Sequence, residues 1–300
     1  MIRENASTSL AENALNQTHS RCVCFEAKFD RAYYRGITES KRIRDTGYLP
    51  AYSTSEFIVI MGEKEHFAVP VQERWVEEIS VEELARYGPL AEYMRASAKI
   101  PGWLRGEEAK AMASLVSSLP DNCVVVEIGS FLGSSSVLLG AALKLRGSGK
   151  LHCVDPFDGS GDAFSVPIYN NILEGNGGKP LRQCFHENIH AADLQNWVEV
   201  HQGSADEISK SWLHPIDLLF LDGDHSPQGA RSAYESWFPM LKIGGIIAIH
   251  NSNPREYAKD HNGSRLLALE EIHPPVYTDI HLVETTTFAR KVATGESFPH

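Results

Sequence analysis

Apolar runs and helical stretches alternate along the second half of the chain. Stretches with strand patterning lie at 123–128, 151–154, 198–201, 216–221 and 245–249, and the first of them has the β-branched content of a strand buried on both faces. Stretches with helical patterning separate them, at 106–119, 134–145, 180–194, 206–213 and 228–241. Strands that alternate with helices at this spacing predict βαβ units, and hence a mostly parallel sheet with right-handed crossovers.

The rhythm changes near the C-terminus. After a helix predicted at 264–272, the strand-like runs 276–283 and 285–292 follow each other with no helix between them. Two adjacent strands joined in this way must pair antiparallel. The sequence therefore predicts an α/β fold whose seven-stranded, mostly parallel sheet ends in a C-terminal antiparallel hairpin.

The first third of the chain is organised differently. Residues 1–20 are polar and predict a loosely docked arm, whereas 57–61 and 66–71 predict a β-hairpin. Residues 81–96 predict a helix that breaks at Gly88-Pro89. We therefore expect an N-terminal α+β extension over residues 1–99, which acts as a lid or a subunit contact in a homo-oligomer, and a main domain over 100–300.

Composition narrows the classes of partner. The chain has 300 residues and a formal net charge of −11, which argues against nucleic-acid binding because phosphate recognition needs clustered Lys and Arg. Apolar runs are only strand-length, and the N-terminus lacks a signal-peptide core, so we expect a cytoplasmic protein that binds no membrane. Cys123 and Cys153 predict buried thiols, and Cys22 and Cys24 lack the partners of a zinc site.

A small-residue loop follows the first strand of the main domain. The stretch Val126–Gly133 ends a buried strand with the acid Glu127 and opens a helix that Ser134–Ser136 can cap. Free N–H groups of a helix N-terminus and a carboxylate at a strand end suit the ribose of a nucleotide-type cofactor. A dinucleotide is disfavoured, because the carboxylate would repel a pyrophosphate and Phe131 stands where the G-x-G-x-x-G fingerprint requires glycine.

Three further motifs follow this loop in a fixed order. They are His152–Phe157, Leu221–His225 and Leu241–Ile247. With Val126–Gly133 they make the chain resemble the class I S-adenosylmethionine-dependent methyltransferases over about residues 100–292. The sequences of these motifs are most similar to those of bacterial small-molecule O-methyltransferases, a group that includes sugar-modifying enzymes of antibiotic pathways. The resemblance implies a Rossmann-like fold and methylation of a small polar acceptor, as in natural-product biosynthesis.

The resemblance also implies which residues hold S-adenosylmethionine. Residues of the first loop would surround the methionine part and the ribose, Asp155 would take the ribose hydroxyls by bidentate hydrogen bonding, and the segment after the third strand would lie near the adenine. The expected cofactor-binding residues are Glu127, Gly129, Ser130, Phe131, Gly133, Ser135, Asp155, Gly203, Ser204, Ala205 and Asp222.

The catalytic residues are expected directly after the fourth strand of the main domain. Asp222 and His225 follow the apolar run 216–221, so they face the crevice at the carboxyl end of the sheet. His225 is the expected general base, since imidazole accepts a proton at neutral pH, and Asp222 would orient the substrate or a metal. A hydroxyl acceptor is favoured, and an amine is the alternative.

Some methyltransferases of this class bind a divalent cation such as Mg²⁺ through residues that directly follow the fourth and fifth strands in the sequence. The matching positions here are Asp222, His250 and Asn251. The catechol-type pattern has a carboxylate before the asparagine, and His250 in its place would suit a softer ion. The alternative is that His250 and Asn251 only shape the acceptor pocket.

Other features leave alternatives open. Trp103 either covers the cofactor or packs in the core, and the insertion 159–179 is a long loop that could act as a lid. His186 and His190 have helical spacing but no third ligand, so surface positions are favoured. Two other function classes compete with methyl transfer: an NAD-dependent oxidoreductase, and a methyltransferase-like partner subunit without activity.

Overall fold

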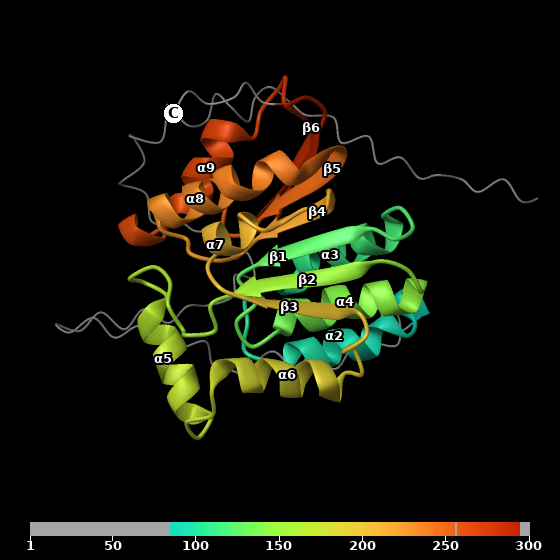
Figure 1. Cartoon of the computed structure of the whole chain (residues 1–300), viewed down its shortest axis with the longest axis vertical. Helices are drawn as coiled ribbons and strands as arrows, with labels where there is room; N and C mark the ends of the chain where they lie inside the picture. Colours follow the sequence, from blue (N-terminus) through green and yellow to red (C-terminus); the bar gives the residue numbers. More distant parts are fainter. Residues whose placement is uncertain (1–84, 256, 295–300) are drawn as a thin grey trace, which may run out of the picture. The chain divides into compact units, whose positions relative to one another are not determined.

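A computed structural model describes residues 85–255 and 257–294 of the chain. Its strands are β1 (Val124–Ile128), β2 (Lys150–Asp155), β3 (Val198–Gln202), β4 (Ile216–Leu221), β5 (Leu241–Ile249), β6 (Tyr277–Val283) and β7 (Thr286–Lys291). Within the described residues they form one seven-stranded sheet of order β3-β2-β1-β4-β5-β7-β6 (Figure 1). β1 to β5 pair parallel, and β7 pairs antiparallel with both β5 and β6. The predicted Rossmann-like sheet with its terminal hairpin is confirmed.

Helices cover both faces of this sheet (Figure 1). One face carries α2 (Leu90–Ala98), α3 (Gly106–Ser118), α4 (Ser134–Arg146) and α6 (Leu181–Ala191). The other carries α7 (Ala205–Ser209), α8 (Pro227–Trp237) and α9 (Gly263–Glu271). A further helix, α5 (Val166–Gly175), lies beyond the carboxyl ends of β1 and β2.

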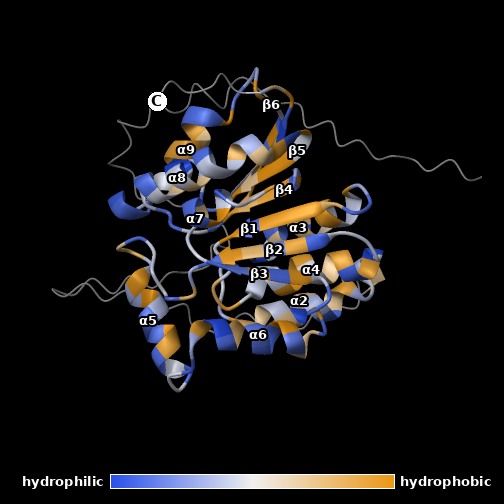
Figure 2. Ribbon diagram, in the orientation of Figure 1, coloured by the Kyte–Doolittle hydropathy of each residue, from blue (hydrophilic) through white to orange (hydrophobic). Residues whose placement is uncertain are grey.

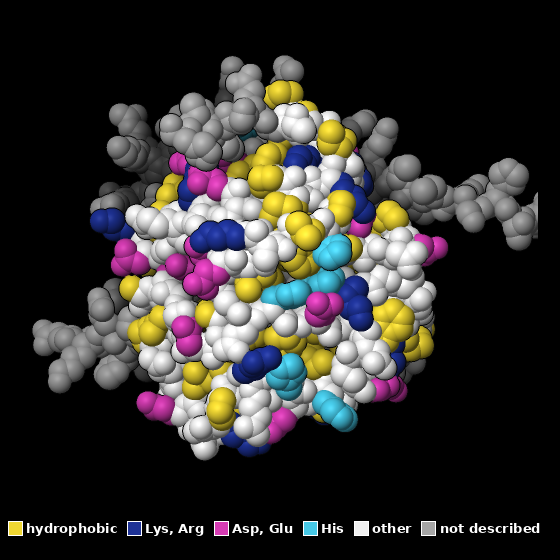
Figure 3. All heavy atoms as spheres, viewed as in Figure 1, with side chains coloured by type: hydrophobic (Ala, Val, Ile, Leu, Met, Phe, Trp, Pro, Cys, Tyr) yellow, Lys and Arg dark blue, Asp and Glu magenta, His cyan; other side chains and the backbone are white. Residues whose placement is uncertain are grey.

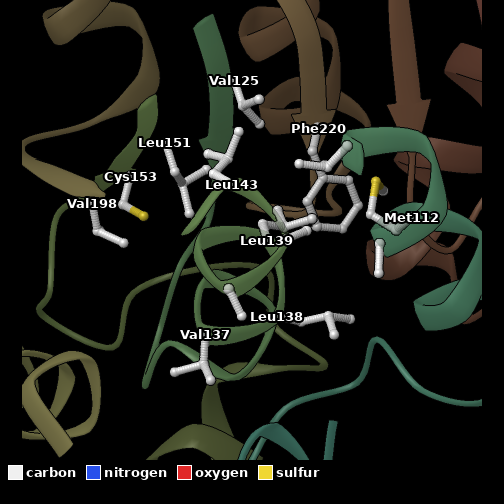
Figure 4. Close-up of a cluster of buried hydrophobic side chains, with 14 of the residues drawn as sticks. Met112, Val125, Val137, Leu138, Leu139, Leu143, Leu151, Cys153, Val198 and Phe220 are labelled. Atoms are coloured by element: carbon white, nitrogen blue, oxygen red, sulfur yellow. The ribbon is translucent and has the colours of Figure 1, made fainter. Parts of the chain in front are cut away.

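Burial on both faces explains the continuous apolar strands. Every residue of β4 is buried, and Figure 2 shows β1, β4 and β5 as hydrophobic bands through the centre of the domain. α4 is buried on all sides, because it packs against α2, α3, α6 and β2. Its Leu138, Leu139 and Leu143 lie in a cluster with Leu151 of β2 and Phe220 of β4 (Figure 4).

Two predicted element boundaries are wrong near β5. The helix predicted to reach 241 ends at Trp237 and continues as a 3₁₀ turn, Phe238–Met240, in which Pro239 has no N–H to donate to the α-helical ladder. β5 starts at Leu241 rather than at 245. Its pairing with β4 shifts register between Ile216 and Leu218, and Gly244 adopts a φ of +87° there. This irregularity hid the first half of the strand from pattern analysis.

The insertion 159–179 is not a plain loop, contrary to the sequence expectation. It contains α5, which begins with Pro167 in its first turn, where the missing N–H of proline costs nothing. Asn170 and Asn171 are weak helix formers, and none of the helix residues is fully buried. The helical signal was therefore weak.

Part of the predicted extension packs on the main domain. α2 contacts α4, the Ser97 hydroxyl donates to the Ser134 carbonyl at 2.8 Å, and the Lys144 ammonium lies 5.7 Å from the Tyr93 ring centroid. The predicted arm, the hairpin and Cys22 with Cys24 lie outside the described residues. In the described part, no helix combines the length and the apolarity needed to cross a membrane.

Candidate active site

A cavity of about 780 Å³ opens at the carboxyl ends of the parallel strands. Its size lies within the range of about 300–1,000 Å³ that is usual for small-molecule sites. The loops after β1 to β5 and the α5 segment all contribute to its wall. This is where ligands of open α/β sheets bind, because the strand order reverses direction between β1 and β4.

Most of the predicted cofactor residues line this cavity, and some do not. Those in the wall are Gly129, Ser130, Phe131, Ser135, Asp155, Ser204, Ala205 and Asp222. Glu127, Gly133 and Gly203 lie behind it. Gly133 instead forms the N-cap of α4 in a left-handed conformation, with a φ of +86°. The expected capping of α4 by Ser134–Ser136 is therefore wrong.

Asp155 holds the loop after β1 in place. Its Oδ2 accepts the backbone N–H groups of Ser130 and Phe131, each at 2.8 Å, and its Oδ1 accepts the N–H of Phe157 at 2.6 Å. Burial raises the pKa of this carboxyl group, against the lowering effect of these hydrogen bonds. A carboxylate offers about four acceptor positions, so about one remains for a ligand. The carboxylate cannot make the predicted bidentate bond to a ribose unless the loop moves.

Glu127 supports the same loop from below. Its Oε2 accepts hydrogen bonds from the hydroxyls of Ser130 and Ser136 and from the Cys153 thiol, while Oε1 has no partner. The side chain is fully buried, and this burial raises the pKa of its carboxyl group. These contacts place Glu127 among the residues that shape the loop.

Three aromatic side chains meet in the cavity wall. Trp103 precedes α3, Phe131 belongs to the β1 loop, and Tyr169 lies on α5. Their ring centroids are 4.8 Å apart for Phe131 and Tyr169, 5.5 Å for Trp103 and Tyr169, and 5.8 Å for Trp103 and Phe131. Trp103 therefore lines the cavity, which agrees with the first of its two predicted roles.

The charged groups of the wall all have one sign. Asp155, Asp222 and Asp224 line the cavity, and none of its described lining residues is Lys or Arg. Such a wall favours a ligand that carries positive charge. It disfavours the pyrophosphate of a dinucleotide, because the aspartates would repel its negative charge.

Asp222 and His225 are brought together as predicted. His225 Nε2 lies 3.5 Å from Asp222 Oδ1, and His225 Nδ1 forms a 2.9 Å hydrogen bond with the Ser264 hydroxyl at the start of α9. Both residues line the cavity, and His225 is otherwise buried. With one ring nitrogen engaged by Ser264, the other is directed to Asp222.

Behind Asp222 lies a buried imidazole between two carboxylates. His250 Nδ1 is 3.7 Å from Asp222 Oδ1, and His250 Nε2 is 3.8 Å from Glu108 Oε1. Neither nitrogen has a hydrogen-bond partner in the described part of the chain, and His250 does not line the cavity. The other oxygen of Glu108 accepts from Thr285 and Thr286.

These residues fit a metal ion poorly. Asp222 and Asn251 line the cavity, whereas His250 lies outside its lining, with its ring between the carboxylates of Asp222 and Glu108. His250 is behind the cavity wall, so an ion held by it would be remote from an acceptor. The function proposed below uses no step through a metal.

Sequence reasoning missed a group of residues on the side of the cavity next to α5. His261 Nδ1 lies 3.2 Å from Asp162 Oδ1 and 3.3 Å from the Ser165 hydroxyl. Tyr257 lines the cavity with a buried hydroxyl that has no hydrogen-bond partner among the residues that the structure describes, and burial raises the pKa of Tyr257 to about 12. For Tyr257 and His261, the sequence signal was their position soon after the carboxyl end of β5. Asp162 and Ser165 belong to the insertion 159–179, which follows β2. His186 and His190 on α6 are exposed, as predicted.

Asp162 ties the insertion to the rest of the domain, so Asp162→Asn is expected to destabilise the fold. Although burial opposes it, hydrogen bonding to His261 and Ser165 lowers the pKa of Asp162 to about 2. A folded-state pKa below the unfolded value stabilises the protein at pH values above about 4, and that contribution is lost as the pH falls toward 2. Chemical denaturation should show a loss of about 2 kcal/mol at pH 7 and about half of it at pH 3.

The exposed Asp158 of the same segment provides the control for this variant. Asp158→Asn should change the free energy of unfolding by no more than about 0.5 kcal/mol. Equal losses for both variants at pH 7 would show that the buried contact with His261 does not anchor the segment.

Part of the chain is similar to known proteins. Residues 126–252 match the family model of a methyltransferase domain, which confirms the resemblance to that class. Several solved structures are similar to this chain. One is the O-methyltransferase TomG from Streptomyces achromogenes in complex with SAM, which is 17% identical in sequence with a TM-score of 0.49. The match covers 74% of this chain and 99% of TomG. A candidate O-methyltransferase of Klebsiella pneumoniae has 18% identity and a TM-score of 0.49 over the same shares, 74% and 99%. The cofactor-bound Rv0187 from MTB has 15% identity and a TM-score of 0.48, over 70% of this chain and 95% of that one.

Proposed function

We propose that this chain, whose residues 126–252 carry a methyltransferase domain, transfers a methyl group from S-adenosylmethionine to a hydroxyl of a small polar metabolite. The natural setting would be the biosynthesis of a secondary metabolite. The observation that carries the proposal is the cavity wall, which combines three aspartates with the contacting rings of Trp103, Phe131 and Tyr169 and has no Lys or Arg among its described residues.

That wall suits a sulfonium cofactor. S-adenosylmethionine supplies an activated methyl group on a positively charged sulfur. The faces of Trp103, Phe131 and Tyr169 can stabilise such a cation, because each aromatic face carries partial negative charge. The remaining acceptor position of Asp155 would bind one ribose hydroxyl, and Ser204 with Ala205 would lie against the adenine. The same wall would repel the pyrophosphate of NAD.

The chain's own residues would prepare the acceptor. His225 Nε2 would take the proton from the acceptor hydroxyl, and Asp222, 3.5 Å away, would stabilise the imidazolium that results. The Ser264 hydroxyl orients the ring through Nδ1. Positioning contributes most of the remaining acceleration, because the leaving group is already good. The Tyr257 hydroxyl and the His261 ring, which line the same cavity, would contact the acceptor.

Thermal melting in the presence of ligands tests the choice of cofactor. S-adenosylhomocysteine at about 100 times its Kd should stabilise the fold by about 2.7 kcal/mol, which raises Tm by about 5–10 °C for a domain of this size. NAD at the same concentration should leave Tm unchanged. A rise with NAD alone would favour an oxidoreductase, and no rise with either ligand would favour a partner subunit without activity.

The chemistry of the acceptor needs its own assay. Release of S-adenosylhomocysteine should be followed with panels of small polyhydroxylated and amine compounds. Turnover with the hydroxyl panel supports the proposal. Turnover confined to amines would replace O-methylation by N-methylation at the same site.

A further inference from the structure

Three side chains that methyl transfer does not use meet at the β3 edge of the sheet. The parallel register pairs His152 of β2 with Glu199 of β3, and Val154 with His201. Because side chains two residues apart point to the same face of a strand, His152, Glu199 and His201 share one face. His152 Nδ1 lies 3.0 Å from His201 Nε2, and the Glu199 carboxylate lies 3.8 Å from His152 Nδ1 and 3.7 Å from His201 Nε2.

We propose that His152, Glu199 and His201 bind a divalent transition-metal ion such as Zn²⁺. Their potential ligand atoms lie within 4.8 Å of one another. Two ligand atoms on a tetrahedral zinc ion are roughly 3.3–3.4 Å apart when the bonds are about 2.0–2.1 Å long. The two imidazole nitrogens are 3.0 Å apart, Glu199 Oε2 is 3.8 Å from His152 Nδ1 and Glu199 Oε1 is 3.7 Å from His201 Nε2, so side-chain rotation can bring one carboxylate oxygen and both nitrogens around an ion.

The surroundings prepare the two rings for this role. Trp212 packs edge-on against His152 at 4.9 Å and His201 at 5.5 Å between ring centroids, which restricts both imidazoles. Burial lowers the pKa of His152 to about 4 and also lowers that of His201. Both rings are therefore neutral at pH 7, and neutral imidazole is the form that binds metals.

The site is open to solvent on one side. The side chain of His152 is 10% exposed, whereas those of His201 and Glu199 are 24% and 54% exposed. Figure 3 shows histidine side chains gathered at the centre of one face, over the place that β2 and β3 occupy in Figure 1. An ion can thus enter from solvent and keep a water as its fourth ligand.

The donor set selects the class of ion and predicts its structural effect. Two imidazole nitrogens and one carboxylate favour Zn²⁺, Co²⁺, Ni²⁺ or Cu²⁺ over Mg²⁺ and Ca²⁺. The ion would join β3 to β2 directly before Gln202, whose side-chain amide donates to the Pro156 carbonyl at 3.2 Å. Both strands lead into the cavity wall, at Asp155 and at Ser204. Metal binding would therefore brace the edge of the sheet that carries part of this wall.

Titration of the full-length, metal-free chain with Co²⁺ and Zn²⁺ tests the site. Co²⁺ should produce the visible absorption of a tetrahedral complex at one equivalent, and calorimetry should show the same stoichiometry for Zn²⁺. In His201→Gln the affinity for Zn²⁺ should fall about a hundredfold or more, because a direct ligand is lost. Glu199→Gln should weaken binding at least about tenfold. Thermal melting without metal checks that both variants remain folded.

Two control variants locate the binding. His190→Gln disrupts the exposed histidine pair on α6 and should leave the affinity for Zn²⁺ unchanged. Asp222→Asn, in the cavity, should also leave it unchanged. The proposal is overturned if His201→Gln binds Zn²⁺ like the original chain, or if Asp222→Asn abolishes binding. The outcome of the Zn²⁺ titrations does not depend on the change in Tm with S-adenosylhomocysteine. Failure of the metal site can therefore be distinguished from failure of the proposed methyl transfer.

Discussion

A His225→Ala variant is expected to turn over about a hundredfold more slowly or worse than the original chain, with nearly unchanged affinity for S-adenosylhomocysteine. His225 is the imidazole that lines the cavity beside Asp222, with Nε2 3.5 Å from Oδ1 of that carboxylate. Removing the ring removes the proton acceptor but none of the aromatic residues proposed to hold the cofactor, nor Asp155, Ser204 or Ala205. The loss should therefore appear in kcat rather than in cofactor binding.

The measurement combines steady-state kinetics on a hydroxyl acceptor with calorimetry of S-adenosylhomocysteine. Free imidazole added to His225→Ala should restore part of the rate, which a purely structural role would not allow. Phe164→Leu, in the wall beside His261, is the control, since it changes the shape of the cavity without touching a proton acceptor. An unchanged kcat in His225→Ala would remove this residue as the general base.

The buried groups behind Asp222 explain why its carboxylate is well placed. The His250 ring lies between Asp222 and Glu108, and each of its nitrogens faces one carboxylate without reaching hydrogen-bond distance. Glu108 is itself held by Thr285 and Thr286 from the β6–β7 hairpin. The terminal hairpin thus fixes the position of Glu108, the carboxylate on the far side of the His250 ring from Asp222.

The sheet could be predicted because its signal is local. Each buried parallel strand is a continuous apolar run, and the two adjacent runs at the C-terminus allow only antiparallel pairing. The segment of α5 gave no such signal, because its few apolar side chains are only partly buried. β5 was shortened in the prediction because its first residues, 242–244, are exposed and irregular.

The sequence predicted only those residues of the site that lie at or directly after the carboxyl end of a strand. The positions after β1, β2 and β4 correctly placed Phe131, Asp155 and Asp222 at the cavity. Strand position does not say which way a side chain points, so Glu127 and His250 were expected in the wall and lie behind it.

The rest of the wall depends on contacts between distant segments. Asp162 and His261 are 99 residues apart in the chain, and Trp103 meets Tyr169 only in the folded domain. No local pattern of hydrophobic and polar residues encodes such contacts.

Gly129→Ala is expected to have a large effect on both stability and cofactor binding. Gly129 has a φ of +90°, and a Cβ atom there would lie 2.3 Å from the Asp222 carbonyl oxygen and 2.5 Å from Gly223 Cα. Both neighbours are backbone, so the β1 loop must separate from the β4 loop. Left-handed strain and overpacking together should cost about 2–5 kcal/mol of unfolding free energy. The Kd for S-adenosylhomocysteine should rise at least about tenfold, because both loops line the cavity.

Gly147→Ala is the matched control for this variant. Gly147 ends α4 with a φ of +75°, but a Cβ atom there would have no neighbour within 4 Å. It should lose only the strain of a left-handed residue, about 1–2 kcal/mol, and bind S-adenosylhomocysteine like the original chain. Chemical denaturation and calorimetry of both variants therefore separate backbone strain from close approach. Equal stability and equal Kd in the two would mean that the contact between Gly129 and the Asp222 backbone does not shape the cofactor site.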